Sequence, residues 1–179
     1  MRLIGIDGGH TIYELGPVSD VVLFFDCLDL FVVKEQPEKD WSLLTDRLYR
    51  RYLKMDELES AAELMEFARK VFLTLPASSV EWDYTMQEKK TTWLDPSRNN
   101  LGEIFVKYFD TFLKARESAI YFYNRFGIYQ VLKIVPSNIP HAIIEKMRPE
   151  AEYDALDKDA KPFWLRDKIE MPSSLNDKA

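Results

Sequence analysis

The amino-acid sequence predicts one α+β domain over residues 1–136, followed by an appendage over residues 137–179. Three observations lead to this prediction. A glycine pair separates two β-rich runs at the N-terminus, three later segments repeat apolar residues at helical spacing, and prolines and charges become dense after Pro136. We therefore expect an N-terminal hairpin and further short strands to form an antiparallel or mixed sheet packed against three main helices. The appendage should consist of short helices packed on the same domain, with a frayed end.

The predicted hairpin spans residues 2–15. Gly8 and Gly9 lie between its two runs, and glycine adopts the positive φ angles of a tight turn without a steric cost. Gly16 and Pro17 then end the second strand, because this pair is typical of a turn or a loop. The sequence thus starts the sheet at its N-terminus.

The other strands are predicted from shorter patterns. Residues 18–33 are apolar but contain three aspartates, so they fit neither the helical nor the strand period. We expect a short helix capped near Ser19 there, followed by a strand over residues 30–33. Alternating apolar and acidic residues predict another strand over residues 79–84, and residues 128–135 are typical of a last strand.

Each of the three main helices is predicted from an apolar stripe and a capping residue. Asp40 should cap the first helix, whose opposite face is basic. Asp56, with Glu59 three residues later, forms a capping box for the second helix. The third helix should begin at Asn99 or Asn100. The three stripes are Trp41, Leu44, Leu48 and Tyr52; Leu58, Ala61, Met65, Ala68, Phe72 and Leu75; and Leu101, Phe105, Tyr108, Phe112, Ala115, Ala119, Phe122 and Phe126.

Charge and composition exclude several classes of function. Asp and Glu outnumber Lys and Arg by 30 to 24, which gives a net charge of −6. Direct binding of nucleic acid is not expected, because phosphate contacts need a cationic surface. One cysteine and two histidines are too few for a disulfide framework or a zinc site. No apolar run reaches the roughly 18 residues of a membrane span. We expect a cytoplasmic protein with no catalytic constellation, no metal and no cofactor.

Acidic residues gather around two irregular segments, one at residues 35–40 and one beside Trp82 and Trp93. Carboxylates beside an aromatic anchor suit a surface that binds a basic protein, because charge speeds the encounter and the ring supplies a hot spot. The alternative is ordinary surface acidity around a core tryptophan, and we expect Trp82 to lie in the core. The predicted partner-binding residues are Glu35, Glu38, Asp40, Glu81, Asp83, Trp93 and Asp95.

Two other motifs allow alternative interpretations. The Asp7-Gly8-Gly9 turn is similar to the first phosphate loop of sugar-kinase and actin-like ATPases, in which consecutive N–H groups bind phosphate. A small nucleotide- or phosphate-handling enzyme is thus an alternative, although a plain hairpin turn is favoured because that fold needs a second domain. The basic helix face at residues 47–54 could follow a nucleic acid backbone, but pairing with carboxylates such as Asp46 and Asp56 fits the acidic net charge better.

Several strings in the sequence resemble the Immunity protein 70 family. They are Tyr13-Glu14 after the hairpin turn, Leu48-Tyr49, Leu75-Pro76, Val80-Glu81-Trp82-Asp83, the Lys90-x-x-Trp93 loop and Tyr108-Phe109. The resemblance covers roughly residues 1–135, and its most specific part is Pro-x-x-x-Val-x-Trp-Asp at residues 76–83.

This resemblance implies an immunity protein, which protects bacteria from the toxin domains of polymorphic or contact-dependent inhibition systems. The implied partner is a cognate C-terminal toxin domain of the CdiA type, a nuclease whose basic substrate cleft an acidic inhibitor occludes stoichiometrically and without covalent chemistry. An acidic adaptor for some other basic protein is the remaining alternative. The sequence leaves the oligomeric state open.

Overall fold

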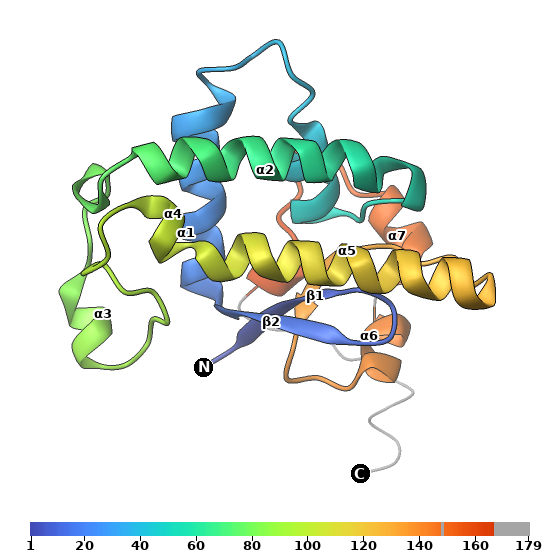
Figure 1. Ribbon diagram of the computed structural model, residues 1–179. Helices are drawn as coiled ribbons and strands as arrows, with labels where there is room; N and C mark the ends of the chain where they lie inside the picture. The colour runs from blue at the N-terminus through green and yellow to red at the C-terminus, as the bar shows by residue number, and fades with distance from the viewer. Residues whose placement is uncertain (148, 167–179) are drawn as a thin grey trace.

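The computed structural model of the protein describes residues 1–147 and 149–166. Its fold is α+β, as predicted, with a three-stranded antiparallel sheet in the order β2-β1-β3 (Figure 1). The strands are β1 (Leu3–Asp7), β2 (Ile12–Pro17) and β3 (Lys133–Pro136). The three longest helices are α1 (Val18–Leu28), α2 (Leu58–Thr74) and α5 (Val106–Phe126). In Figure 1, α5 runs along one side of the hairpin and α2 lies beyond it.

The N-terminal hairpin is confirmed, and it forms the centre and one edge of the sheet. β1 pairs with β2 across the turn, where Asp7 lies opposite Ile12. β3 pairs with the other side of β1, so that Lys133 also lies opposite Asp7. The last strand is shorter than the predicted one over residues 128–135, because Leu132 forms an isolated bridge with Leu53 and the preceding residues do not pair.

The predicted strand over residues 30–33 is wrong. α1 continues directly into a π-helix, Asp29–Val33, so residues 18–33 form one helical segment. Two of the aspartates that hid the helical period, Asp26 and Asp29, are exposed, whereas Asp20 is buried and accepts hydrogen bonds. The buried residues that recur at helical spacing are Val21, Phe24, Phe25, Leu28 and Val32.

The helix predicted after residue 40 is present, and its regular part is a short π-helix, Leu43–Leu48. Asp40 accepts a hydrogen bond from the Ser42 N–H at 3.2 Å where this segment begins. All four predicted stripe residues, Trp41, Leu44, Leu48 and Tyr52, are buried.

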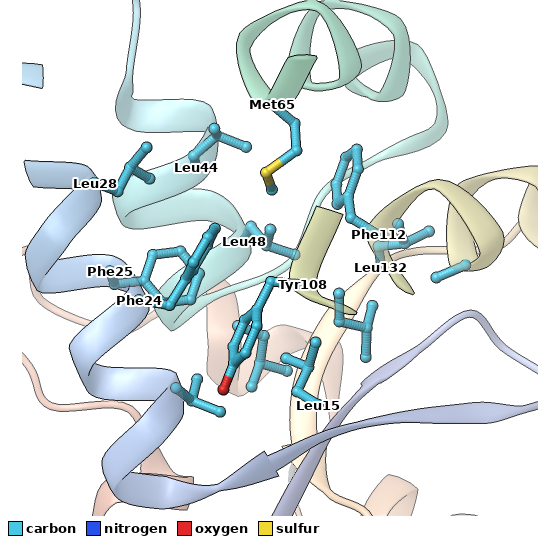
Figure 2. Packing of buried hydrophobic residues seen from close by; sticks show 14 of the residues in the cluster. Leu15, Phe24, Phe25, Leu28, Leu44, Leu48, Met65, Tyr108, Phe112 and Leu132 are labelled. Atoms are coloured by element: carbon cyan, nitrogen blue, oxygen red, sulfur yellow. The ribbon is translucent and has the colours of Figure 1, made fainter. Parts of the chain in front are cut away.

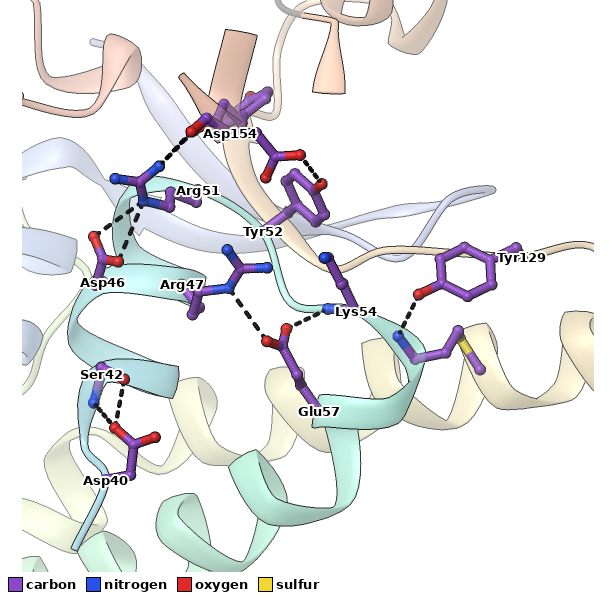
Figure 3. Close-up of polar contacts among 12 residues, drawn as sticks. Asp40, Ser42, Asp46, Arg47, Arg51, Tyr52, Lys54, Glu57, Tyr129 and Asp154 are labelled. Atoms are coloured by element: carbon purple, nitrogen blue, oxygen red, sulfur yellow. Dashed lines mark hydrogen bonds and ion pairs between the residues drawn. The ribbon is translucent and has the colours of Figure 1, made fainter. Parts of the chain in front are cut away.

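The second predicted helix is α2, preceded by a 3-10 turn, Met55–Glu57. The predicted capping box of Asp56 and Glu59 is wrong. Glu57 instead accepts the Lys54 N–H at 2.8 Å, so the cap belongs to the turn that leads into α2 (Figure 3).

The predicted strand over residues 79–84 is also wrong. A 3-10 turn, Ala77–Ser79, and a short helix, α3 (Tyr84–Glu88), occupy this part of the chain. Asp83 accepts the Thr85 N–H at 3.0 Å and so begins α3, which is the competition that aspartate offers to strand pairing. Trp82 is half-buried rather than fully in the core, and its Nε1–H donates to the Ala77 carbonyl at 2.8 Å.

The third predicted helix is confirmed as α4 (Leu101–Ile104) followed by α5. Asn100 caps it by accepting the Glu103 N–H at 2.9 Å, and Gly127 ends it with a φ of 66°. The predicted stripe is buried as far as Ala119. Phe126 breaks the pattern, because α5 extends beyond the sheet and leaves this side chain 56% exposed.

Aromatic rings from three helices form the centre of the core. Figure 2 shows Phe24 of α1 and Tyr108 of α5 there, with Met65 of α2 close by. Phe24 of α1 stacks on Tyr108 of α5 with 4.7 Å between the ring centroids. Phe105 and Phe109 meet the same Phe24 ring edge-on at 5.5 Å, and Phe72 of α2 does so at 5.9 Å. Such pairs each add about 1 kcal/mol to the free energy gained by burial, so this cluster fixes how the three helices pack.

Residues 137–147 and 149–166 pack on the same core as the rest of the chain. They contain α6 (His141–Met147), α7 (Glu150–Asp154) and a 3-10 turn, Phe163–Leu165. Tyr153 and Trp164 are each 1% exposed. The predicted frayed end, residues 167–179, lies outside the described residues.

The basic helix face is engaged in contacts within the chain (Figure 3). The Arg51 guanidinium pairs with Asp46 at 3.2 Å and donates to the carbonyl oxygens of Tyr153 and Asp154 at 3.1 and 2.9 Å. Arg47 pairs with Glu57 at 3.3 Å. Pairing with Asp46 is therefore confirmed, and Arg51 ties the helix to the appendage.

Across residues 1–147 and 149–166, every helix is too short or too polar to span a bilayer. The same residues contain no group of three or more His, Cys, Asp or Glu side chains placed to hold a metal ion.

Candidate functional site

Trp93 lies on the irregular segment between α3 and α4, and 41% of its surface is exposed. The segment is held by Asp20 of α1, which is only 3% exposed. The Trp93 N–H donates to Asp20 Oδ2 at 2.7 Å, and the Thr92 hydroxyl donates to Asp20 Oδ1 at 2.8 Å. A buried carboxylate therefore holds the backbone that carries an exposed aromatic ring.

The environment of Asp20 shifts its acidity. Burial raises the pKa of Asp20 above 3.8, and the hydrogen bonds from Trp93 and Thr92 offset only part of that rise. The folded chain is thus less stable with Asp20 ionised than with Asp20 protonated. The same carboxylate orders the loop that carries Trp93.

The Trp93 ring is also supported from the sides. The Lys107 ammonium of α5 lies 4.1 Å from the ring centroid, in the position of a cation–π contact. At the end of β2, the ring lies so close to Gly16 that an added Cβ would be 3.4 Å from it. These contacts leave one part of the ring free to meet a partner.

Three of the predicted carboxylates, Glu81, Asp83 and Asp95, are exposed near this ring. Asp83 accepts the Thr85 hydroxyl and N–H at 2.7 and 3.0 Å, and these hydrogen bonds lower the pKa of Asp83. Asp95 accepts the Ser97 hydroxyl and N–H at 2.6 and 3.1 Å, which lowers the pKa of Asp95 in the same way. Both side chains are therefore ionised at neutral pH.

Glu81 and Asp83 stand at the edge of a hollow of about 130 Å³ between α1, α3 and the Trp93 loop. Neither carboxylate has a basic side chain within ion-pair distance in the described part of the chain, whereas Asp95 pairs with Arg98 at 3.2 Å. The apolar walls of the hollow are Leu23, Trp82, Met86, Leu94 and Pro96. Such a hollow suits a lysine or arginine side chain, whose stem is apolar and whose end is cationic.

The other predicted patch, Glu35, Glu38 and Asp40, is exposed but lies elsewhere. It follows the end of the helical segment over residues 18–33, whereas Asp20 and the Trp93 loop lie at its beginning. At the helical rise per residue, the two patches are about 20 Å apart. The structure therefore brings Glu81, Asp83, Trp93 and Asp95 together and separates them from the first patch.

Asp20 and Thr92 were not among the predicted site residues. The signal in the sequence was an aspartate within an apolar run, since a buried carboxylate needs donors. A second unpredicted feature lies at the far end of α5, where several aromatic and aliphatic side chains are exposed. They are Tyr121, Tyr123, Phe126, Ile128 and Tyr129.

The Asp7-Gly8-Gly9 turn uses its own amides. The Gly8 N–H donates to the Thr11 carbonyl at 3.1 Å, and the Gly9 N–H donates to Asp7 Oδ1 at 2.8 Å. Neither amide is available to hold a phosphate, so the geometry is that of a hairpin turn.

Comparison of the chain with protein-family models, with curated proteins and with solved structures finds no match. The resemblance to the Immunity protein 70 family stays a prediction.

Proposed function

We propose that this protein is an immunity protein, which binds a cognate toxin domain of a contact-dependent inhibition system and blocks it stoichiometrically. The observation that supports this proposal is an exposed Trp93 held in place by a buried Asp20, beside a hollow whose rim carries the unpaired carboxylates Glu81 and Asp83. An ordered aromatic ring beside exposed carboxylates is a composition that suits a binding site for a basic protein.

The toxin surface that fits this site is basic. A lysine or arginine side chain could enter the hollow with its stem against Trp82 and its cationic end at Glu81 and Asp83, while an apolar toxin side chain covers Trp93. Nuclease domains carry basic side chains around their substrate clefts, because they bind phosphates. Occupying those side chains excludes the substrate without any chemistry by the inhibitor.

The first test is co-expression with the toxin fragment encoded by the neighbouring large gene. Cells that make both proteins should survive, cells that make the fragment alone should not, and the two purified proteins should elute together from a sizing column. Absence of a complex on the column would refute the proposal. Complex formation with a different basic protein, and none with the fragment, would favour the adaptor alternative.

The second test locates the interface. The triple variant Glu81→Gln, Asp83→Asn and Asp95→Asn removes three charges, and asparagine retains the hydrogen bonds that the two aspartates accept. Its association with the fragment at low salt should be slower by about tenfold or more, since loss of steering acts on the association rate. A matched control neutralises exposed carboxylates elsewhere, Glu63→Gln, Asp157→Asn and Asp159→Asn. An equal effect of both triples would show that only net charge matters.

A further inference from the structure

A polar cavity of about 290 Å³ lies at the turn end of the hairpin, between the sheet and the appendage. It is enclosed by the Asp-Gly-Gly turn, by the segment that leads into β3 and by α6 and α7. The polar side chains in its lining include Asp7, Gln130, Lys133, His141, Glu145 and Glu150. A second hollow of about 280 Å³ shares Lys133, Glu145 and Glu150 with it.

Two of these side chains are buried without a polar partner. Lys133 is 5% exposed and Gln130 is 8% exposed, yet within residues 1–147 and 149–166 neither makes a side-chain hydrogen bond or an ion pair. The Lys133 ammonium lies 5.7 Å from the centroid of the Tyr153 ring, in the position of a cation–π contact. The stems of both residues are buried, and their polar ends reach the open space of the cavity without a partner from the described part of the chain. An ammonium and a carboxamide that face one cavity in this way offer hydrogen bonds to a ligand.

Asp7 does not supply the missing partner for Lys133, although the two residues lie opposite each other on adjacent strands. Its carboxylate is 1% exposed and is held by the Gly9 N–H and by His141, whose Nε2 lies 3.1 Å from Oδ1 and 2.9 Å from Oδ2. His141 Nδ1 in turn lies 3.5 Å from Glu145. This chain of contacts engages the Asp7 carboxylate in one wall of the cavity, and among the described residues no ion pair joins it to Lys133.

The charges of the cavity define the class of ligand. Lys133 and Gln130 lie inside and suit a carboxylate, which accepts hydrogen bonds from both. Glu145 and Glu150 are exposed at the mouth, repel a multiply charged anion and suit an ammonium group. We propose that this cavity binds a small zwitterion of the α-amino acid class, with its carboxylate on Lys133 and its amino group toward Glu145 and Glu150. The volume is at the lower end for ligand pockets, which fits so small a molecule.

This inference does not depend on toxin binding. The cavity adjoins the turn end of the hairpin, whereas Trp93 packs near Gly16 at the other end of β2. Either site can fail without consequence for the other.

The experiment is calorimetric titration of the intact protein with each of the common L-α-amino acids. Three reference probes test the parts of the ligand separately: acetate for the carboxylate, ethylamine for the amine and inorganic phosphate for a multiply charged anion. At least one amino acid should bind at a concentration of about 10 mM or below, and about tenfold more tightly than any reference probe. The proposal is overturned if no amino acid binds, or if acetate or phosphate binds as tightly as the best amino acid.

Variants then test the assignment of groups. Lys133→Met should raise the dissociation constant of that amino acid by about tenfold or more, as expected for losing one hydrogen bond to a charged group. Lys114→Met, which makes the same change at an exposed position of α5, should leave it unchanged. Glu145→Gln with Glu150→Gln changes only exposed side chains, so it tests the site even if Lys133→Met does not fold. Unchanged affinity in this double variant contradicts the placement of the amino group.

Discussion

Replacing Asp20 tests whether a buried carboxylate holds the Trp93 loop in place. Asp20→Ala leaves the Trp93 N–H and the Thr92 hydroxyl without their acceptor, whereas Asp20→Asn keeps the shape and an acceptor oxygen. An orphaned donor costs about 1–3 kcal/mol. Water can reach this half-open loop, so the lower value applies to each donor, and the free energy of unfolding of Asp20→Ala should fall by about 2 kcal/mol. The asparagine variant should lose less than about 1 kcal/mol.

The assay combines urea unfolding with hydrogen exchange. In Asp20→Ala the amides of Trp93 and Leu94 should lose their protection, while those of α2 and α5 keep theirs, because only the loop is released. If the loop is also the toxin-binding element, Asp20→Ala should weaken the complex as Trp93→Ala does, and Asp20→Asn should not. Equal stability of the two Asp20 variants, with protected loop amides in both, would refute the reasoning.

The dependence on pH has a defined sign. Burial raises the pKa of Asp20 in the folded chain above 3.8, its ordinary value in the unfolded chain. Between pH 3.8 and the folded-state pKa, the folded state therefore binds more protons than the unfolded state. The stability that protonation of Asp20 contributes is therefore fully present below pH 3.8 and is lost as the pH rises through the folded-state pKa. Asp20→Asn should gain stability relative to the wild type from pH 4 to pH 7, and a constant difference across this range would contradict the burial of an ionised carboxylate.

Three further predictions concern the fold. Gly9→Ala should destabilise the protein by about 3 kcal/mol, because the residue has a φ of 93° and an added Cβ would overlap the Gln130 side chain. Gly127→Ala should cost about 1 kcal/mol, because its φ is 66° but the space around it is open. Thermal unfolding of the two variants tests this difference. Arg51→Met should lower the free energy of unfolding by about 2 kcal/mol and reduce hydrogen-exchange protection in α7, because it removes the donors to the Tyr153 and Asp154 carbonyl oxygens. Unchanged protection would show that packing alone holds α7. Cys27 should resist iodoacetamide at pH 8 in the folded protein and react in urea, because burial raises the pKa of its thiol to about 12.

Local patterns predicted the parts of the fold that local contacts determine. α2 and the α4–α5 region follow from apolar stripes with clear ends, and the hairpin follows from its glycine pair. The two wrong strand predictions have a common cause. In both segments the contribution of an aspartate depends on where its side chain lies in a helix, and the sequence pattern does not show that position. In residues 18–33 the aspartates were treated as interruptions, although two of them lie on the solvent side of a helix. Asp83 was treated as the polar face of a strand, although its side chain begins α3.

Both sites depend on contacts between segments that are far apart in the chain. The sequence pattern does not predict such contacts. The composition around Trp93 identified three of the carboxylates near it, but not Asp20, whose partners are 72 and 73 residues away. The cavity shows the limit more clearly. The sequence places Asp7 in a hairpin turn, with a phosphate loop as the alternative, and Lys133 in the last strand, and neither pattern indicates that the two residues line one cavity. Their neighbourhood follows from the register of β1 and β3, and that of His141 from the packing of the appendage.

The buried position of Asp20 combines a loss of solvation with hydrogen bonds to the Trp93 loop. An apolar side chain facing Leu23 and Leu94 would be buried without the loss of solvation that raises the pKa of this carboxylate. It would, however, accept no hydrogen bond from the Trp93 N–H, and the loop would be free to move. The hydrogen bonds that the carboxylate accepts thus offset its loss of solvation and hold a partly exposed tryptophan in place. A ring that is already ordered loses little conformational entropy on binding, which is the property that a tight inhibitor needs from its anchor.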